Sequence, residues 1–208
     1  YMNIVRKFIR PMVLTGIAAI LLGLIRYAGV NQGSYLWLNW NLFLAWIPFF
    51  LVYVVYKMRF PNWINGLLLL SWLFFLPNAP YLVTDFIHLD VVGAREDIWY
   101  DAIMIFMYTI SGIVAWIGSV HMVKIRYSLS SWFVPVIALL SGYGVYLGRY
   151  IRFNSWDLVT QPIKVLETII ATLAMPKDFY PVITMTASIA LMLIVAYYSF
   201  AEQNNHEH

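Results

Sequence analysis

Long, unbroken runs of apolar residues recur along nearly the whole chain. Each run holds about 20 residues, which is the length that an α-helix needs to cross a hydrocarbon core of ~30 Å. A transmembrane barrel would show alternating apolar and polar positions instead. The pattern therefore predicts an all-α integral membrane bundle of about six transmembrane helices, near residues 11–30, 36–56, 63–83, 99–123, 132–151 and 179–200.

The third apolar run ends in a stretch that contains two prolines, Pro77 and Pro80. Pro77 lacks an amide hydrogen and clashes with the preceding turn, so the third helix is predicted to break there. Asn78 can then cap a new helical segment. At α-helical spacing, four polar side chains of that segment share one face, namely Asn78, Tyr81, Asp85 and His88. This face indicates either a polar site on a broken helix or a proline kink that carries an Asp–His pair near the membrane interface.

Six spans leave no room for a soluble domain. Residues 1–203 are therefore predicted to form a single transmembrane helical domain, and residues 204–208 a disordered tail. Between the last two spans, the segment near residues 160–174 has an amphipathic pattern. Its apolar positions fall on one helical face: Ile163, Leu166, Ile169, Ile170 and Leu173. Such a pattern is typical of a helix that lies in the membrane interface.

Charged residues make up 11% of the chain, far below the roughly 25% of a soluble protein. Seven of the 13 basic residues lie at the N-terminus and in two turns, at residues 57–59 and 124–126, whereas eight of the 10 acidic residues lie on the opposite side. Because short loops rich in Lys and Arg stay in the cytoplasm, both termini are predicted to be cytoplasmic. Topology thus explains the basic charge, so we expect membrane lipids and no nucleic acid as partners.

The candidate catalytic and binding residues lie on the acid-rich side. Asp97 begins the fourth span, where the helix dipole favours a carboxylate. Asp101 lies one turn deeper and needs a cation, a metal ion or a proton. The candidate catalytic residues are Asp85 and His88, as general base and acid, and Asp101. Nearby arginines could bind a phosphate or pair with these acids. The candidate substrate-binding residues are Arg26, Asn78, Tyr81, Arg149, Arg152, Asn154 and Asp157.

The sequence limits the cofactors that the protein could use. It holds no cysteine, which excludes disulfides and thiolate metal sites. His121 follows Asp101 by 20 residues on one predicted helix, a distance of about 30 Å, so it cannot join His88 in a metal site. A divalent cation at Asp85, His88 and Asp101 remains open. The chain shows no nucleotide-binding motif.

Four stretches of the sequence are distinctive: residues 41–48 (NLFLAWIP), 75–89 (FLPNAPYLVTDFIHL), 99–101 (WYD) and 152–157 (RFNSWD). Together they resemble a family of bacterial polytopic membrane proteins catalogued as a domain of unknown function (DUF1361). The resemblance covers about residues 35 to 200. It implies a multi-pass protein of the bacterial cytoplasmic membrane, and it implies no activity.

Three hypotheses for the function follow. The leading one is an outward-facing polar site that binds or processes an anionic, lipid-like or lipid-linked molecule. The second is a non-enzymatic accessory or scaffold subunit that contacts a membrane-protein partner, or a second copy of the chain, through Gly144, Gly148 and the segment 157–175. The third is a small transporter that uses Asp101 and Arg149 as an ion-coupled pair.

Overall fold

The computed structural model describes residues 2–29, 35–58, 60–89, 97–174 and 179–201. The chain divides into two compact units, residues 1–129 and 130–208, which are described separately below. The prediction of a single domain over residues 1–203 stays a prediction. The acidic residues of the segment 90–96 and the predicted disordered tail lie outside the described residues.

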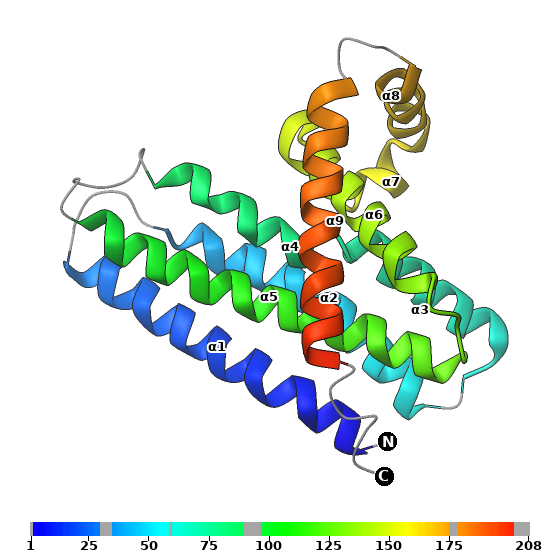
Figure 1. Ribbon diagram of the computed structural model, residues 1–208, viewed down its shortest axis with the longest axis horizontal. Helices are drawn as coiled ribbons and strands as arrows, with labels where there is room; N and C mark the ends of the chain where they lie inside the picture. Colours follow the sequence, from blue (N-terminus) through cyan, green and yellow to red (C-terminus); the bar gives the residue numbers. More distant parts are fainter. Residues whose placement is uncertain (1, 30–34, 59, 90–96, 175–178, 202–208) are drawn as a thin grey trace. The chain divides into compact units, whose positions relative to one another are not determined.

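All elements of the described residues are helices (Figure 1). Unit 1 contains α1 (Met2–Gly29), α2 (Trp37–Lys57), α3 (Asn62–Phe75), α4 (Asn78–Tyr81), the 3₁₀ helix η1 (Leu82–His88) and α5 (Ile98–Arg126). Unit 2 contains α6 (Phe133–Tyr146), the π-helical turn η3 (Leu147–Ile151), α7 (Asp157–Thr160), α8 (Pro162–Ala174) and α9 (Phe179–Ala201).

Within the described residues, six helices are long and apolar enough to cross a membrane. They are Val5–Gly29, Trp37–Lys57, Asn62–His88, Ile98–Arg126, Phe133–Ile151 and Tyr180–Ala201. The predicted all-α fold with six spans is therefore confirmed, and the protein is a multi-pass membrane protein. The cytoplasmic location of the termini stays a prediction.

Helix α5 lies at the centre of unit 1, where it packs against α1, α2, α4 and η1. Small residues line its buried face, including Ser111, Gly112, Ala115 and Gly118. A Cβ atom at Gly112 would overlap the backbone carbonyl of Ala79. The close approach of α4 to α5 therefore depends on this glycine, because small residues let the backbones of membrane helices meet.

The predicted break at Pro77 is confirmed, since α3 ends at Phe75 and α4 begins at Asn78. The amide of Ala79 donates to Leu76 O, three residues back. An α-helix would instead pair it with Phe75 O, and the Asn78 side-chain amide donates to that carbonyl at 2.8 Å. The Asn78 side chain thus bonds the end of α3.

The chain after α4 differs from the predicted α-helix, because residues 82–88 form a 3₁₀ helix. In a 3₁₀ helix, residues three apart lie on the same side. Leu82 and Asp85, three apart in η1, are each 0% exposed, and so are Leu76 and Ala79, which precede η1 at the same spacing. Asp85 therefore shares its face with apolar residues, whereas Asn78 and Tyr81 are only half-buried.

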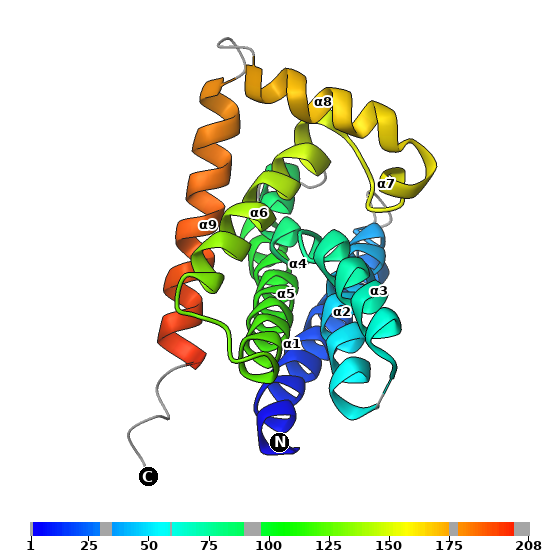
Figure 2. The same ribbon diagram turned by 90° about the vertical axis from the view of Figure 1, so that its right-hand side faces the viewer.

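In unit 2, α6 and α9 cross closely at Gly142, where a Cβ atom would overlap the backbone of Thr186. The partner contact through Gly144 and Gly148 stays a prediction. The predicted amphipathic helix is confirmed as α8, which runs across the direction of α9 (Figure 2). Since α9 is a candidate span, this direction suits a helix in the plane of the interface.

The apolar face of α8 is exposed. Ile163, Leu166 and Ile170 are 73%, 58% and 59% exposed, whereas Val165 and Thr172 on the opposite side are buried. The Tyr143 hydroxyl on α6 lies 2.8 Å from the Thr172 hydroxyl. The interfacial location of α8 stays a prediction, and this burial pattern agrees with an apolar face that points toward lipid.

A single methyl group at Gly112 should destabilise unit 1. We expect Gly112→Ala to lower the free energy of unfolding by about 1–3 kcal/mol, because the added methyl overlaps backbone that cannot move away cheaply. Gly66→Ala is the matched control, since nothing lies within 4 Å of a Cβ there, and alanine favours helix. Thermal unfolding of both variants in detergent tests this. Equal unfolding temperatures for the two would contradict the packing described.

Candidate functional site

An ion pair joins the C-terminal end of α1 to the N-terminal end of α5. Arg26 Nε donates to Asp101 Oδ1 at 2.6 Å, and Arg26 Nη2 donates to Asp101 Oδ2 at 3.1 Å. Arg26 Nη1 also donates to Asp97 Oδ2 at 3.2 Å. The two helices run antiparallel along each other (Figure 1). A cation at the end of α1 and carboxylates at the start of α5 are therefore each favoured by the helix dipole.

This ion pair is removed from solvent. Arg26 is 6% exposed and Asp101 is 0% exposed, whereas the side chain of Asp97 is 43% exposed. Burying two charges is costly unless the geometry is good, and removal of one partner leaves the other uncompensated. Asp101 was predicted to need a cation, a metal ion or a proton, and Arg26 provides the cation through two side-on hydrogen bonds.

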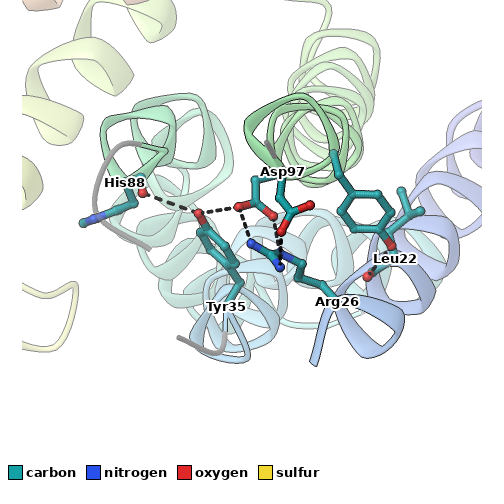
Figure 3. A network of polar contacts seen from close by, with 7 residues as sticks. Leu22, Arg26, Tyr35, His88 and Asp97 are labelled. Carbon is teal, nitrogen blue, oxygen red and sulfur yellow. Dashed lines mark hydrogen bonds and ion pairs between the residues drawn. The ribbon is translucent and has the colours of Figure 1, made fainter. Parts of the chain in front are cut away.

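Tyr35, which precedes α2, connects this ion pair to the end of η1. Its hydroxyl lies 3.2 Å from Asp101 Oδ2 and 3.4 Å from the backbone carbonyl of His88 (Figure 3). Burial, together with the Asp101 carboxylate, raises the pKa of Tyr35 to about 12. The hydroxyl therefore keeps its proton at neutral pH and acts as a hydrogen-bond donor.

Asp85 and His88 project from η1 into different surroundings. Asp85 is fully buried, and Asn41 Nδ2 on α2 donates to its Oδ2 atom at 3.2 Å. His88 is half-buried, and its ring meets Trp37 edge-on, with ring centroids 4.9 Å apart. The two residues are one 3₁₀ turn apart and lie on the same side, at about 6 Å along the axis.

The candidate catalytic residues do not form a metal-binding group. No three His, Asp or Glu side chains among the described residues gather closely enough to hold a metal ion. The Asp101 carboxylate contacts Arg26 and Tyr35, and its role as a catalytic residue stays a prediction. His121 packs against Phe8 near the start of α1, with ring centroids 5.5 Å apart. It therefore lies far from His88, as helix length predicts.

The remaining candidate residues lie in unit 2. Arg149 is half-buried within η3, and Arg152 is exposed with a left-handed backbone, at φ 65° and ψ 33°. The carboxylate of Asp157 is buried and accepts the backbone N–H of Asn154 at 2.7 Å. Asn154 and Asp157 thus close the turn that begins α7. That these residues share one ligand with Asp85 and His88 stays a prediction.

Sequence patterns did not single out Tyr35, or assign a role to Asn39 or Asn41. The two asparagines interrupt an apolar span, and amides within a membrane helix need partners. Asn41 bonds Asp85, and Asn39 Oδ1 accepts the hydroxyl of Tyr108 at 2.6 Å. Tyr35 precedes the helix and carries no periodic signal, so only tertiary structure locates it.

The two aspartates of the ion pair should differ in their effects on stability. We expect Asp101→Asn to lower the free energy of unfolding by about 3–5 kcal/mol, because it leaves Arg26 poorly compensated in a buried place. Asp97→Asn, the same substitution at a part-exposed position, should cost less than about 1 kcal/mol. Unfolding in mixed micelles measures both values. Similar losses for the two variants would show that burial does not govern this ion pair.

Comparison with known proteins identifies the family. No curated protein and no solved structure matches the chain. Residues 40–194 match a family described as "Protein of unknown function (DUF1361)". This match covers most of the chain. It includes all four stretches that carried the resemblance in the sequence. The chain belongs to the DUF1361 family.

Proposed function

We propose that the protein binds an anionic, lipid-like or lipid-linked molecule through Arg149, which lies in η3, and Arg152, which follows it. The observation that carries this proposal is the exposure of the Arg152 side chain together with its backbone conformation. Its side chain is exposed, and its backbone is left-handed. A left-handed conformation costs a non-glycine residue roughly 1–2 kcal/mol, and glycine would avoid this cost. An arginine at this position therefore supports a role for its side chain.

The local structure holds Arg152 in this conformation. The backbone amides of Arg152 and Phe153 both donate to Leu147 O, which closes the π-helical turn. The turn of Asn154 and Asp157 follows immediately. Since π-helical turns occur frequently at functional sites, this geometry agrees with a binding role.

The surroundings of Arg152 suit a lipid headgroup. Tyr150 and Trp156 on either side of it are 60% and 42% exposed, and such aromatic side chains favour the depth of the headgroups. A guanidinium can donate two parallel hydrogen bonds to a phosphate or carboxylate. Arg149, three residues earlier, would add a second positive charge. Arg26 has no part in this proposal, because its guanidinium forms the buried ion pair with Asp101 and also bonds Asp97.

Substitution of Arg152 should separate binding from stability. We expect Arg152→Gly to lower retention of an anionic lipid about tenfold, as loss of a charge-assisted contact does. The unfolding temperature should stay equal or rise, because glycine relieves the left-handed backbone. Nanodiscs of phosphatidylcholine with phosphatidylglycerol, followed by native mass spectrometry, measure the retained lipid.

Lys164→Gln is the control for this experiment, since it removes an exposed positive charge from α8. Arg152→Lys should give an intermediate loss, because it keeps the charge without the paired donors. If Arg152→Gly and Lys164→Gln retain phosphatidylglycerol equally well, the proposed binding site is wrong.

A second candidate function is proton transfer by Asp85 and His88, and the contact of Asn41 with Asp85 favours it. Asn41 donates a hydrogen bond to one oxygen of the Asp85 carboxylate and so favours one orientation of the group. Because residues three apart lie on the same side of a 3₁₀ helix, the two groups can act on one bound molecule or through one water. We propose Asp85 as the base and His88 as the acid of such a pair.

Substitution of Asp85 or His88 should abolish proton transfer, while the protein should still accumulate in the membrane. We expect Asp85→Asn and His88→Gln to accumulate in the membrane, yet fail to restore the phenotype of a strain that lacks the gene, because neither amide exchanges protons near neutral pH. His121→Gln is the matched control at the other end of α5 and should restore it. Restoration by His88→Gln would rule out the acid–base role.

A further inference from the structure

His88 has two contacts with the short stretch at the start of α2. Tyr35 lies 3.4 Å from its backbone carbonyl, and the Trp37 ring lies against its imidazole. The last carbonyls of a helix lack partners within that helix. The Tyr35 hydroxyl provides one for His88 at the end of η1, as Figure 3 shows.

The other contact of the Tyr35 hydroxyl is the Asp101 carboxylate, at 3.2 Å. A tyrosine hydroxyl carries one proton, so it donates to one of these two acceptors at a time. Arg26 holds Asp101 in place through two hydrogen bonds. The position of the Tyr35 hydroxyl is therefore fixed by α1 and α5, and Tyr35 as a whole is 3% exposed.

We infer that Tyr35 is a positioning residue for His88, which transmits the fixed geometry of the Arg26–Asp101 ion pair to the end of η1. Asp101 acts on His88 through Tyr35, since its own contacts are with Tyr35 and Arg26. Trp37 restricts the imidazole, and Tyr35 holds the backbone from which it projects. This inference rests on the acid–base role proposed for His88.

The reactivity of His88 tests this inference without knowledge of the natural ligand. Purified full-length protein in detergent is treated with diethyl pyrocarbonate, and modification of each histidine is followed by peptide mass spectrometry. We expect Tyr35→Phe to raise the rate at His88, relative to His121, about threefold or more, the factor for loss of one hydrogen bond. The ¹⁵N shifts of the His88 imidazole should change, and those of His121 should not.

Tyr100→Phe is the matched control. The Tyr100 hydroxyl donates to Leu22 O at 2.8 Å and joins α5 to α1 without contact to His88. It should leave the ratio of the two rates unchanged. An unchanged ratio in Tyr35→Phe, or an equal rise in both variants, would overturn the inference. Failure of the acid–base role would instead appear as restored function in His88→Gln, so the two failures are distinguishable.

Discussion

The arrangement of unit 1 depends on one buried ion pair. Arg26 and Asp101 are almost wholly removed from solvent and meet through two hydrogen bonds. In a low-dielectric environment neither charge is tolerable without the other. The pair therefore fixes the end of α1 against the start of α5. Tyr35 contacts both Asp101 and the backbone carbonyl of His88, and so connects the ion pair to the end of η1.

Further along α1 and α5 from the ion pair, these two helices and α2 are joined by hydrogen-bonded polar groups in an otherwise apolar interior. The indole of Trp46 donates to the Ser111 hydroxyl at 2.9 Å, and that hydroxyl donates to Met12 O at 2.9 Å. Gly16 of α1 leaves the space that Trp46 occupies, since a Cβ atom there would overlap the indole. The Trp46 indole and the Ser111 hydroxyl thus both have hydrogen-bond partners, as an apolar environment requires. Glycine and hydroxyl side chains together allow α1 to approach α2 and α5.

Hydropathy was enough to predict the spans, because each must be apolar over its whole length. The break at Pro77 and the helix α8 also follow from local chemistry, namely a missing amide hydrogen and an amphipathic period. The 3₁₀ form of η1 could not be predicted in this way. It changes which residues share a face with Asp85, and packing against α5 decides it, for example through the Thr109 hydroxyl on Leu82 O.

The partner of Asp101 illustrates the same limit. Sequence and topology left Arg26, Arg149, Arg152, a metal ion and a proton as candidates, and Arg26 is 75 residues away along the chain. Only the antiparallel packing of α1 on α5 selects it. Asn41 and Tyr35 are comparable cases, since each contacts a candidate catalytic residue from a distant part of the sequence. Spacing alone carries no information about such contacts.

The central claim is that Arg26 and Asp101 stabilise each other and thereby organise this end of unit 1. A double-mutant cycle with Arg26→Met and Asp101→Leu, measured by reversible unfolding in mixed micelles, tests it most directly. Each single variant leaves one buried charge, whereas the double variant leaves none. The account predicts a coupling of about 2–5 kcal/mol, with the double variant more stable than either single one. Additive losses, with a coupling near zero, would contradict it.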